Sequence, residues 1–253
     1  MDSRSQKVID VIKLPLLFIA VIWVIHLVQF GFELHLGYLG LLPRDFSGIR
    51  GILLAPLLHA DFAHLTHNSI PLFVLSSLIL YFYPRVAMRS FTAIYLLTGL
   101  MVWLIGNYFF CGLEYGHQCK SYHIGASGVV YGLATFIMGN GIFRKNIKSV
   151  ALALIILFYY SGMFVGILPV EEGVSWESHL YGAIVGFFVA YYFKHELEED
   201  EKPVPPSWAS EDPANTNYFF ARDTFEKTKL QRKLEEEARL RNENGEDWVS
   251  DRT

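Results

Sequence analysis

Long runs of apolar residues are the feature that most restricts how this chain can fold. A helix of about 20 mainly apolar residues crosses the hydrocarbon core of a bilayer, which is about 30 Å thick. Backbone groups inside lipid must satisfy their own hydrogen bonds, so each crossing segment is expected to be helical. The sequence therefore predicts an all-α, polytopic membrane protein with six transmembrane helices. The predicted spans cover residues 14–32, 64–83, 91–110, 125–143, 150–168 and 178–193.

The positive charges support this count of six spans, because most of them fall on one side. Cytoplasmic loops of membrane proteins are enriched in Lys and Arg. The basic residues that flank the spans on this side are Arg4, Lys7, Lys13, Arg85, Arg89, Arg144, Lys145, Lys148 and Lys194. The opposite side carries mainly acidic residues, namely Glu33, Asp61, Glu114, Glu171, Glu172 and Glu177. We therefore expect a multi-pass protein of the cell membrane, the bacterial inner membrane, with both termini in the cytoplasm.

Composition divides the chain into three parts. We expect a cytoplasmic N-terminus at 1–13, a membrane domain at 14–193 and a charged cytoplasmic tail at 194–253. Within the membrane domain, charges mixed with Leu and Ile over 33–58 indicate a segment that lies at the interface rather than crossing it. The tail begins with an acidic run and a proline-rich linker. It is predicted to be partly disordered, with an amphipathic helix as one option for 218–242.

Charge and cysteine content exclude some functions and leave others open. The formal net charge is -4 and no basic patch stands out, so a nucleic-acid partner is not expected. Cys111 and Cys119 flank one polar loop, and are either two unrelated thiols or a local disulfide in an oxidising compartment. No H-E-x-x-H motif occurs, which disfavours a metalloprotease. We expect neither a cofactor nor a catalytic metal.

Polar residues within the predicted spans are functional candidates, because ionisable groups are costly in lipid. One cluster comprises His59, His64, His67 and Asn68 at the outer end of the second span. Ser127 begins the fourth span and His179 begins the sixth. Spans two, four and six run in the same direction, so the three sites lie at one depth, toward the outer side.

These residue types suit nucleophilic catalysis. A serine hydroxyl such as that of Ser127 needs a base, and the imidazole of His179 can take its proton. Asn68 and His64, four residues apart on one helix face, could donate hydrogen bonds to an oxyanion. No carboxylate was expected near the spans to orient the base, so the sequence predicts a Ser–His dyad. Tyr131, one turn after Ser127, could stack on the imidazole.

Glycines in the fourth and sixth spans would allow these helices to pack closely. The fourth span has Gly125, Gly128 and Gly132, and the sixth has Gly182 and Gly186. Each feature alone also has a simpler interpretation. A serine near a helix start is usually a cap, a glycine pair usually serves packing, and a histidine at a span end can be interfacial. The features gain weight only together.

Taken together, these motifs resemble the rhomboid intramembrane serine proteases, in their bacterial six-span form. The resemblance covers about residues 10–193 and implies hydrolysis of a peptide bond in or beside a transmembrane helix of a substrate protein. It implies Ser127 as nucleophile, His179 as base, His64 and Asn68 at the oxyanion hole, and His59 as a structural residue. Two positions depart from the family pattern: Ile49-Arg50 stands where many members have Trp-Arg, and Ser178 replaces a common alanine.

Two other functions remain open at this stage. One is a catalytically inactive rhomboid-like protein that binds membrane clients. The other is a small transporter or metal channel that uses the histidine cluster. The aromatic residues of the fifth span, such as Phe158 and Phe164, form either a lateral gate or a lipid-facing surface. Expected partners are transmembrane substrates and the lipid bilayer, while the sequence leaves the oligomeric state unknown.

Overall fold

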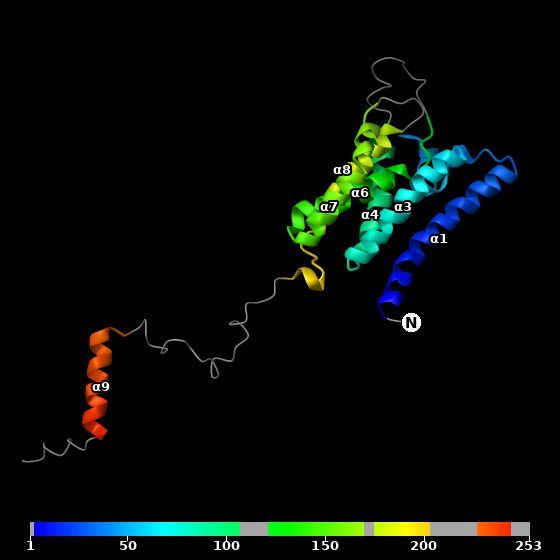
Figure 1. Ribbon diagram of the computed structural model, residues 1–253. Coiled ribbons are helices and arrows are strands. Elements are labelled where there is room, and N and C mark those ends of the chain that lie inside the picture. Colours follow the sequence, from blue (N-terminus) through cyan, green and yellow to red (C-terminus); the bar gives the residue numbers. More distant parts are fainter. Residues whose placement is uncertain (1–2, 107–120, 170–174, 203–226, 244–253) are drawn as a thin grey trace, which may run out of the picture. The chain divides into compact units, whose positions relative to one another are not determined.

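The computed structural model describes residues 3–106, 121–169, 175–202 and 227–243 (Figure 1). These ranges are helical and contain no strand, only one antiparallel bridge between Leu41 and His123. The prediction of an all-α fold is therefore confirmed. The α-helices are α1 (Ser3–Gly31), α2 (Gly51–Leu54), α3 (Phe62–Phe82), α4 (Ala87–Ile105), α6 (Ser127–Arg144), α7 (Ile147–Tyr159), α8 (Trp176–Tyr192) and α9 (Lys229–Glu243). The short 3-10 helices are η1 (Leu36–Leu39), η2 (Phe46–Gly48), η3 (Ala55–Leu57), η5 (Ser161–Ile167) and η6 (Glu199–Glu201).

Among the residues that the structure describes, three helices are long and apolar enough to cross a membrane: Ile9–Gly31 of α1, then α3 and α4. A fourth is obtained if α7 and η5 are counted as one bent span. These helices indicate a helical membrane protein, and three or four of the six predicted spans meet the criteria of length and hydropathy. α6 and α8 are helices at the predicted places, with 18 and 17 residues. α6 contacts α3, α4, α7 and α8, so its glycines and Asn140 face protein rather than lipid.

The contact between α6 and α8 is made backbone to backbone at glycines. A Cβ atom at Gly182 would lie 2.0 Å from the carbonyl oxygen of Gly128. A Cβ atom at Gly186 would lie 1.9 Å from the carbonyl oxygen of Gly132. Any side chain there would therefore overlap the neighbouring helix. The close packing of the fourth and sixth segments expected from their glycines is present.

The fifth predicted span is not one straight helix. α7 ends at Tyr159, and η5 follows at an angle of 64°. The hydroxyl of Ser161 donates a hydrogen bond of 3.0 Å to the carbonyl of Phe158, at the point where the helix ends. Serine side chains that bond nearby carbonyls compete with helical hydrogen bonds. The fifth predicted span, 150–168, is therefore a helix with a sharp bend after Tyr159, which can still count as one bent span.

The membrane unit also extends further than the sequence indicated. Residues 1–202 form one compact unit and residues 203–253 another. The acidic run after residue 194, expected to belong to the tail, instead packs with the helices. In the second unit, α9 overlaps the C-terminal part of the region 218–242, where an amphipathic helix was considered, and ends one residue beyond it. Segment 33–58 contains only short helices, as expected for a stretch that does not cross. Cys111 and Cys119 lie outside the described residues.

Candidate active site

A tight turn places Ser127 at the first position of α6. Gly125 in this turn has φ +107°, a conformation that suits glycine, and its N–H donates to the carbonyl of Ala55 at 2.8 Å. A Cβ atom at Gly125 would lie 2.6 Å from Nε2 of His64 and 3.4 Å from Nδ2 of Asn68. The turn is thus packed directly against the polar side chains of α3.

Ser127 and His179 are in hydrogen-bond contact across the α6–α8 interface. Nε2 of His179 lies 2.8 Å from the hydroxyl oxygen of Ser127, and the imidazole is buried with 7% of its surface exposed. The other ring nitrogen, Nδ1, lies 2.8 Å from the carbonyl oxygen of Gly166 in η5. A carbonyl can only accept, so Nδ1 carries the proton in the neutral ring. The lone pair of Nε2 then faces the hydroxyl of Ser127, as a general base requires.

The ring of Tyr131 stacks on one face of the His179 imidazole. The two rings are 4.2 Å apart and nearly parallel, at 7°. The hydroxyl of Tyr131 donates to the carbonyl of Met163 at 2.7 Å. The stacking expected from the sequence is present, but the participation of Met163 and Gly166 was not anticipated. The only sequence feature that could have indicated their participation is a pair of glycines, Gly162 and Gly166, that interrupt an apolar run.

His64 and Asn68 belong to the start of α3 and lie beside Gly125, in the loop that precedes Ser127. Asp61 caps this helix by accepting a hydrogen bond of 2.8 Å from the N–H of His64. Asn68 is 5% exposed, and its Nδ2 has no hydrogen-bond partner among the residues that the structure describes. His59 is buried and packs edge-on against His64, with ring centroids 5.1 Å apart. His67 is exposed on the other face.

One of the acidic residues named for the outer side, Glu177, is buried. It lies in the first turn of α8, two residues before His179, and is only 4% exposed. It does not replace the orienting group, because Nδ1 of His179 is bonded to Gly166. Here a backbone carbonyl stands where many serine hydrolases have a carboxylate.

His123, in the segment before α6, is buried and bonded to the start of α8. Its Nδ1 contacts the hydroxyl of Ser175, which lies 2.6 Å from that of Ser178. Its backbone pairs with Leu41 through hydrogen bonds of 2.8 and 2.9 Å. Burial lowers the pKa of His123 to about 4, so the ring is neutral at pH 7. This cluster fixes the helix start that carries His179.

The fold and site together define a helical membrane protein with a hydrogen-bonded Ser–His pair near one end of the bundle. Within the described ranges, no three His, Cys, Asp or Glu side chains are grouped to hold a metal ion. Residues 47–196, more than half of the chain, match the model of the Rhomboid domain. The chain therefore belongs to the rhomboid family.

The similar proteins found are mycobacterial. Uncharacterized proteins of Mycobacterium bovis and Mycobacterium tuberculosis are each 36% identical over 180 residues, which cover 70% of this chain and 72% of theirs. An uncharacterized protein of Mycobacterium leprae is 36% identical over 158 residues, covering 58% of this chain and 60% of its own. These relatives are uncharacterized, so they indicate no activity, and the family assignment rests on the Rhomboid domain match.

Proposed function

We propose that this protein is an intramembrane serine endopeptidase that cleaves peptide bonds in or near the transmembrane segments of other membrane proteins. The observation that carries the proposal is the contact of 2.8 Å between Ser127 and a His179 ring whose second nitrogen is held by Gly166. This arrangement leaves the base in the correct tautomer without a carboxylate. Family membership supports the same class of reaction.

The proposed reaction has two steps. Nε2 of His179 takes the hydroxyl proton as Ser127 attacks the scissile carbonyl, and the carbonyl of Gly166 stabilises the imidazolium. The oxyanion accepts hydrogen bonds from Nδ2 of Asn68, the ring of His64 and the backbone N–H of Ser127. The imidazolium gives its proton to the leaving amine, and an acyl-enzyme remains. Water, deprotonated by the same imidazole, then releases the acyl product and restores the serine.

The proposed setting is a bundle of six spans in the cell membrane, with both termini in the cytoplasm and the dyad toward the outer side. Ser127 and His179 both lie at helix starts, which supports access of water from that end. A substrate helix would have to unwind locally, because its peptide bonds are otherwise closed by backbone hydrogen bonds.

The proposal is tested by labelling the full-length protein in liposomes with a fluorophosphonate. The expected result is a covalent adduct on Ser127 in the wild type and in Ser47→Ala, a control at an exposed serine of η2, and none in Ser127→Ala. Label on a different serine would overturn the assignment. Wild-type protein that binds transmembrane peptides but neither reacts nor cleaves would support the inactive client-binding alternative. Cleavage retained in Ser127→Ala but lost with His67→Ala would favour a role centred on the histidine cluster.

The substitution Asn68→Ala is expected to lower kcat by about 10²- to 10³-fold, since it removes one oxyanion donor. KM should change little, because the contact forms mainly in the transition state. Steady-state cleavage of a transmembrane peptide measures both parameters. Thr66→Ala, an exposed change on the same helix, is the matched control. Unchanged kcat in Asn68→Ala would remove this residue from the proposed oxyanion site.

Gly166→Ala is expected to reduce activity, and Tyr131→Phe is expected to restore part of it. A Cβ atom at Gly166 would lie 2.2 Å from the hydroxyl oxygen of Tyr131 and 3.3 Å from Nδ1 of His179. The clash must displace the carbonyl that orients His179. Removing the hydroxyl relieves the closest overlap while keeping the ring stack.

The comparison needs the two single variants and the double variant, measured by the rate of fluorophosphonate labelling. Tyr131→Phe alone loses one hydrogen bond, to Met163, and should be destabilised by about 0.5–1.5 kcal/mol. A double variant no faster than Gly166→Ala would contradict the proposed steric cause.

A further inference from the structure

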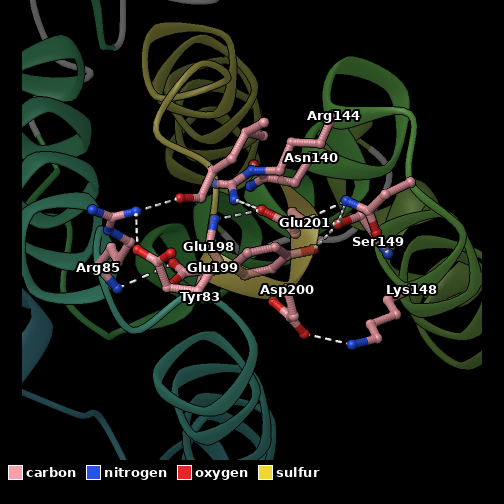
Figure 2. Close-up of polar contacts among 12 residues, drawn as sticks. Tyr83, Arg85, Asn140, Arg144, Lys148, Ser149, Glu198, Glu199, Asp200 and Glu201 are labelled. Atoms are coloured by element: carbon pink, nitrogen blue, oxygen red, sulfur yellow. Dashed lines mark hydrogen bonds and ion pairs between the residues drawn. The ribbon is translucent and has the colours of Figure 1, made fainter. Parts of the chain in front are cut away.

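A single buried carboxylate ties the acidic run to the membrane helices. Both side-chain oxygens of Glu201 are bonded, and only 5% of the side chain is exposed (Figure 2). Oε1 accepts from Nδ2 of Asn146 at 2.6 Å and from the hydroxyl of Ser149 at 3.0 Å. Oε2 accepts from Nη1 of Arg144 and from the backbone N–H of Glu198 at 2.9 Å. A carboxylate with four donors is a ligand in a formed site rather than part of a loose tail.

The site is assembled from the ends of three helices. Arg144, at the end of α6, has no exposed side-chain surface, and its guanidinium lies 4.8 Å from the ring centre of Tyr83 after α3. Nε of Arg144 donates to Asn140 at 2.6 Å. Asn146 caps the start of α7 by accepting from the N–H of Ser149, so the positive end of that helix faces the carboxylate. The geometry is that of a carboxylate receptor at the end of the bundle away from Ser127.

Residues 196–201, which include Glu201 and which we call the acidic clasp, are bonded to the helices along their whole length. The exposed ion pairs of the clasp contribute little individually. Besides Glu201, Glu198 is also buried. Its carboxylate accepts a hydrogen bond of 3.1 Å from the backbone N–H of Arg85, and burial raises the pKa of this carboxyl group. The exposed pairs join Arg89 to Glu196, Arg85 to Glu199 and Lys148 to Asp200. The clasp thus contacts the ends of α3, α4, α6 and α7.

α7 has few buried residues of its own with which to stay in place. Only Ser149, Leu152 and Ile156 of this helix are buried, and Ser149 itself binds the clasp. The chain continues from α7 directly into η5, whose Gly166 carbonyl orients His179. Movement of α7 away from α6 would therefore be transmitted to the dyad.

We propose that the acidic clasp is an intramolecular ligand that latches α7 onto α6, and through η5 keeps the Gly166 carbonyl on His179. Its ligand class is an acidic peptide, supplied by the same chain. The effect on catalysis rests on the proposed function, whereas the latch itself does not. The clasp residues act as positioning residues, because none of them touches the dyad.

The test compares Glu201→Gln with Glu33→Gln in the full-length protein in liposomes. Glu33 is an exposed carboxylate that lies outside the clasp. Glu201→Gln leaves the buried charge of Arg144 without its partner, which is strongly destabilising at a buried site. We expect hydrogen exchange over residues 147–167 to accelerate by at least about 10-fold, with residues 62–105 unchanged. The rate of fluorophosphonate labelling should fall by a similar factor. Glu33→Gln should match the wild type in both measurements.

Three results would contradict the proposal, either for the latch itself or for its link to His179. Exchange that accelerates only over residues 196–202 would make the clasp a passive attachment. Equal acceleration in all helices would indicate general destabilisation rather than control of α7. Accelerated exchange of α7 with unchanged labelling would remove the link to His179. If the wild type is never labelled, the proposed function fails, while the exchange comparison still decides whether α7 is latched.

Discussion

Ser127→Ala and His179→Ala are each expected to reduce cleavage of a transmembrane substrate by about 10⁴- to 10⁶-fold, the range for removal of a serine-hydrolase nucleophile or its base. The reason is that the hydroxyl and the imidazole act as one unit through their contact of 2.8 Å. Without the base, the hydroxyl keeps its proton, and without the hydroxyl, the base has no nucleophile to activate. The double variant should therefore be no slower than either single variant.

The measurement is single-turnover cleavage in liposomes, with Ser47→Ala as the control for an unrelated hydroxyl. Thermal unfolding of each variant checks that the bundle remains intact. A double variant whose loss equals the product of the two single losses would show that the residues act independently, and the dyad would be rejected. Substantial cleavage in either single variant would have the same consequence.

Gly186→Ala is expected to destabilise the bundle by more than about 3 kcal/mol, above the usual cost of overpacking a core. The added methyl would lie 1.9 Å from the carbonyl oxygen of Gly132 and 2.3 Å from the hydroxyl oxygen of Thr135. No side-chain rotation relieves a clash with a backbone carbonyl, so α6 and α8 must separate. Ser127 and His179, on these two helices, would separate with them, and activity should fall together with stability.

The matched control is Gly162→Ala, because a Cβ atom at Gly162 meets no atom within 4 Å. Unfolding of both variants in mild detergent, followed by loss of helical signal, gives the comparison. Equal stability of the two variants would contradict the close contact of α6 with α8.

The sequence was sufficient to predict an all-α fold and to bring forward Ser127 and His179 as candidates, because both follow from local patterns. Apolar runs identify membrane helices, and glycines three or four residues apart mark where two helices can approach. Ser127, His179 and Asn68 could be placed at one depth from the alternating direction of the spans alone. The roles of these residues remain proposals, although the structure brings their side chains together at the predicted end of the bundle.

The parts that escaped prediction depend on backbone groups and on contacts between distant segments. The carbonyl of Gly166 has no residue-specific signature, so only the bend after Tyr159 shows that it is available to His179. The acidic clasp looks like a solvated charged run, because residue 201 is far in sequence from Arg144. Its burial follows from the shape of a site formed by three helix ends, which no local pattern encodes.

The glycine contacts between α6 and α8 have a consequence for how this protein can vary. Since the two helices touch through main-chain atoms, the separation of Ser127 from His179 is set by the thickness of the backbone itself. Side chains on the outer surface of these helices do not set the separation of Ser127 from His179. Exposed residues of α8, such as Phe188 and Tyr192, can therefore change to suit membranes of different composition while the distance between Ser127 and His179 stays constant.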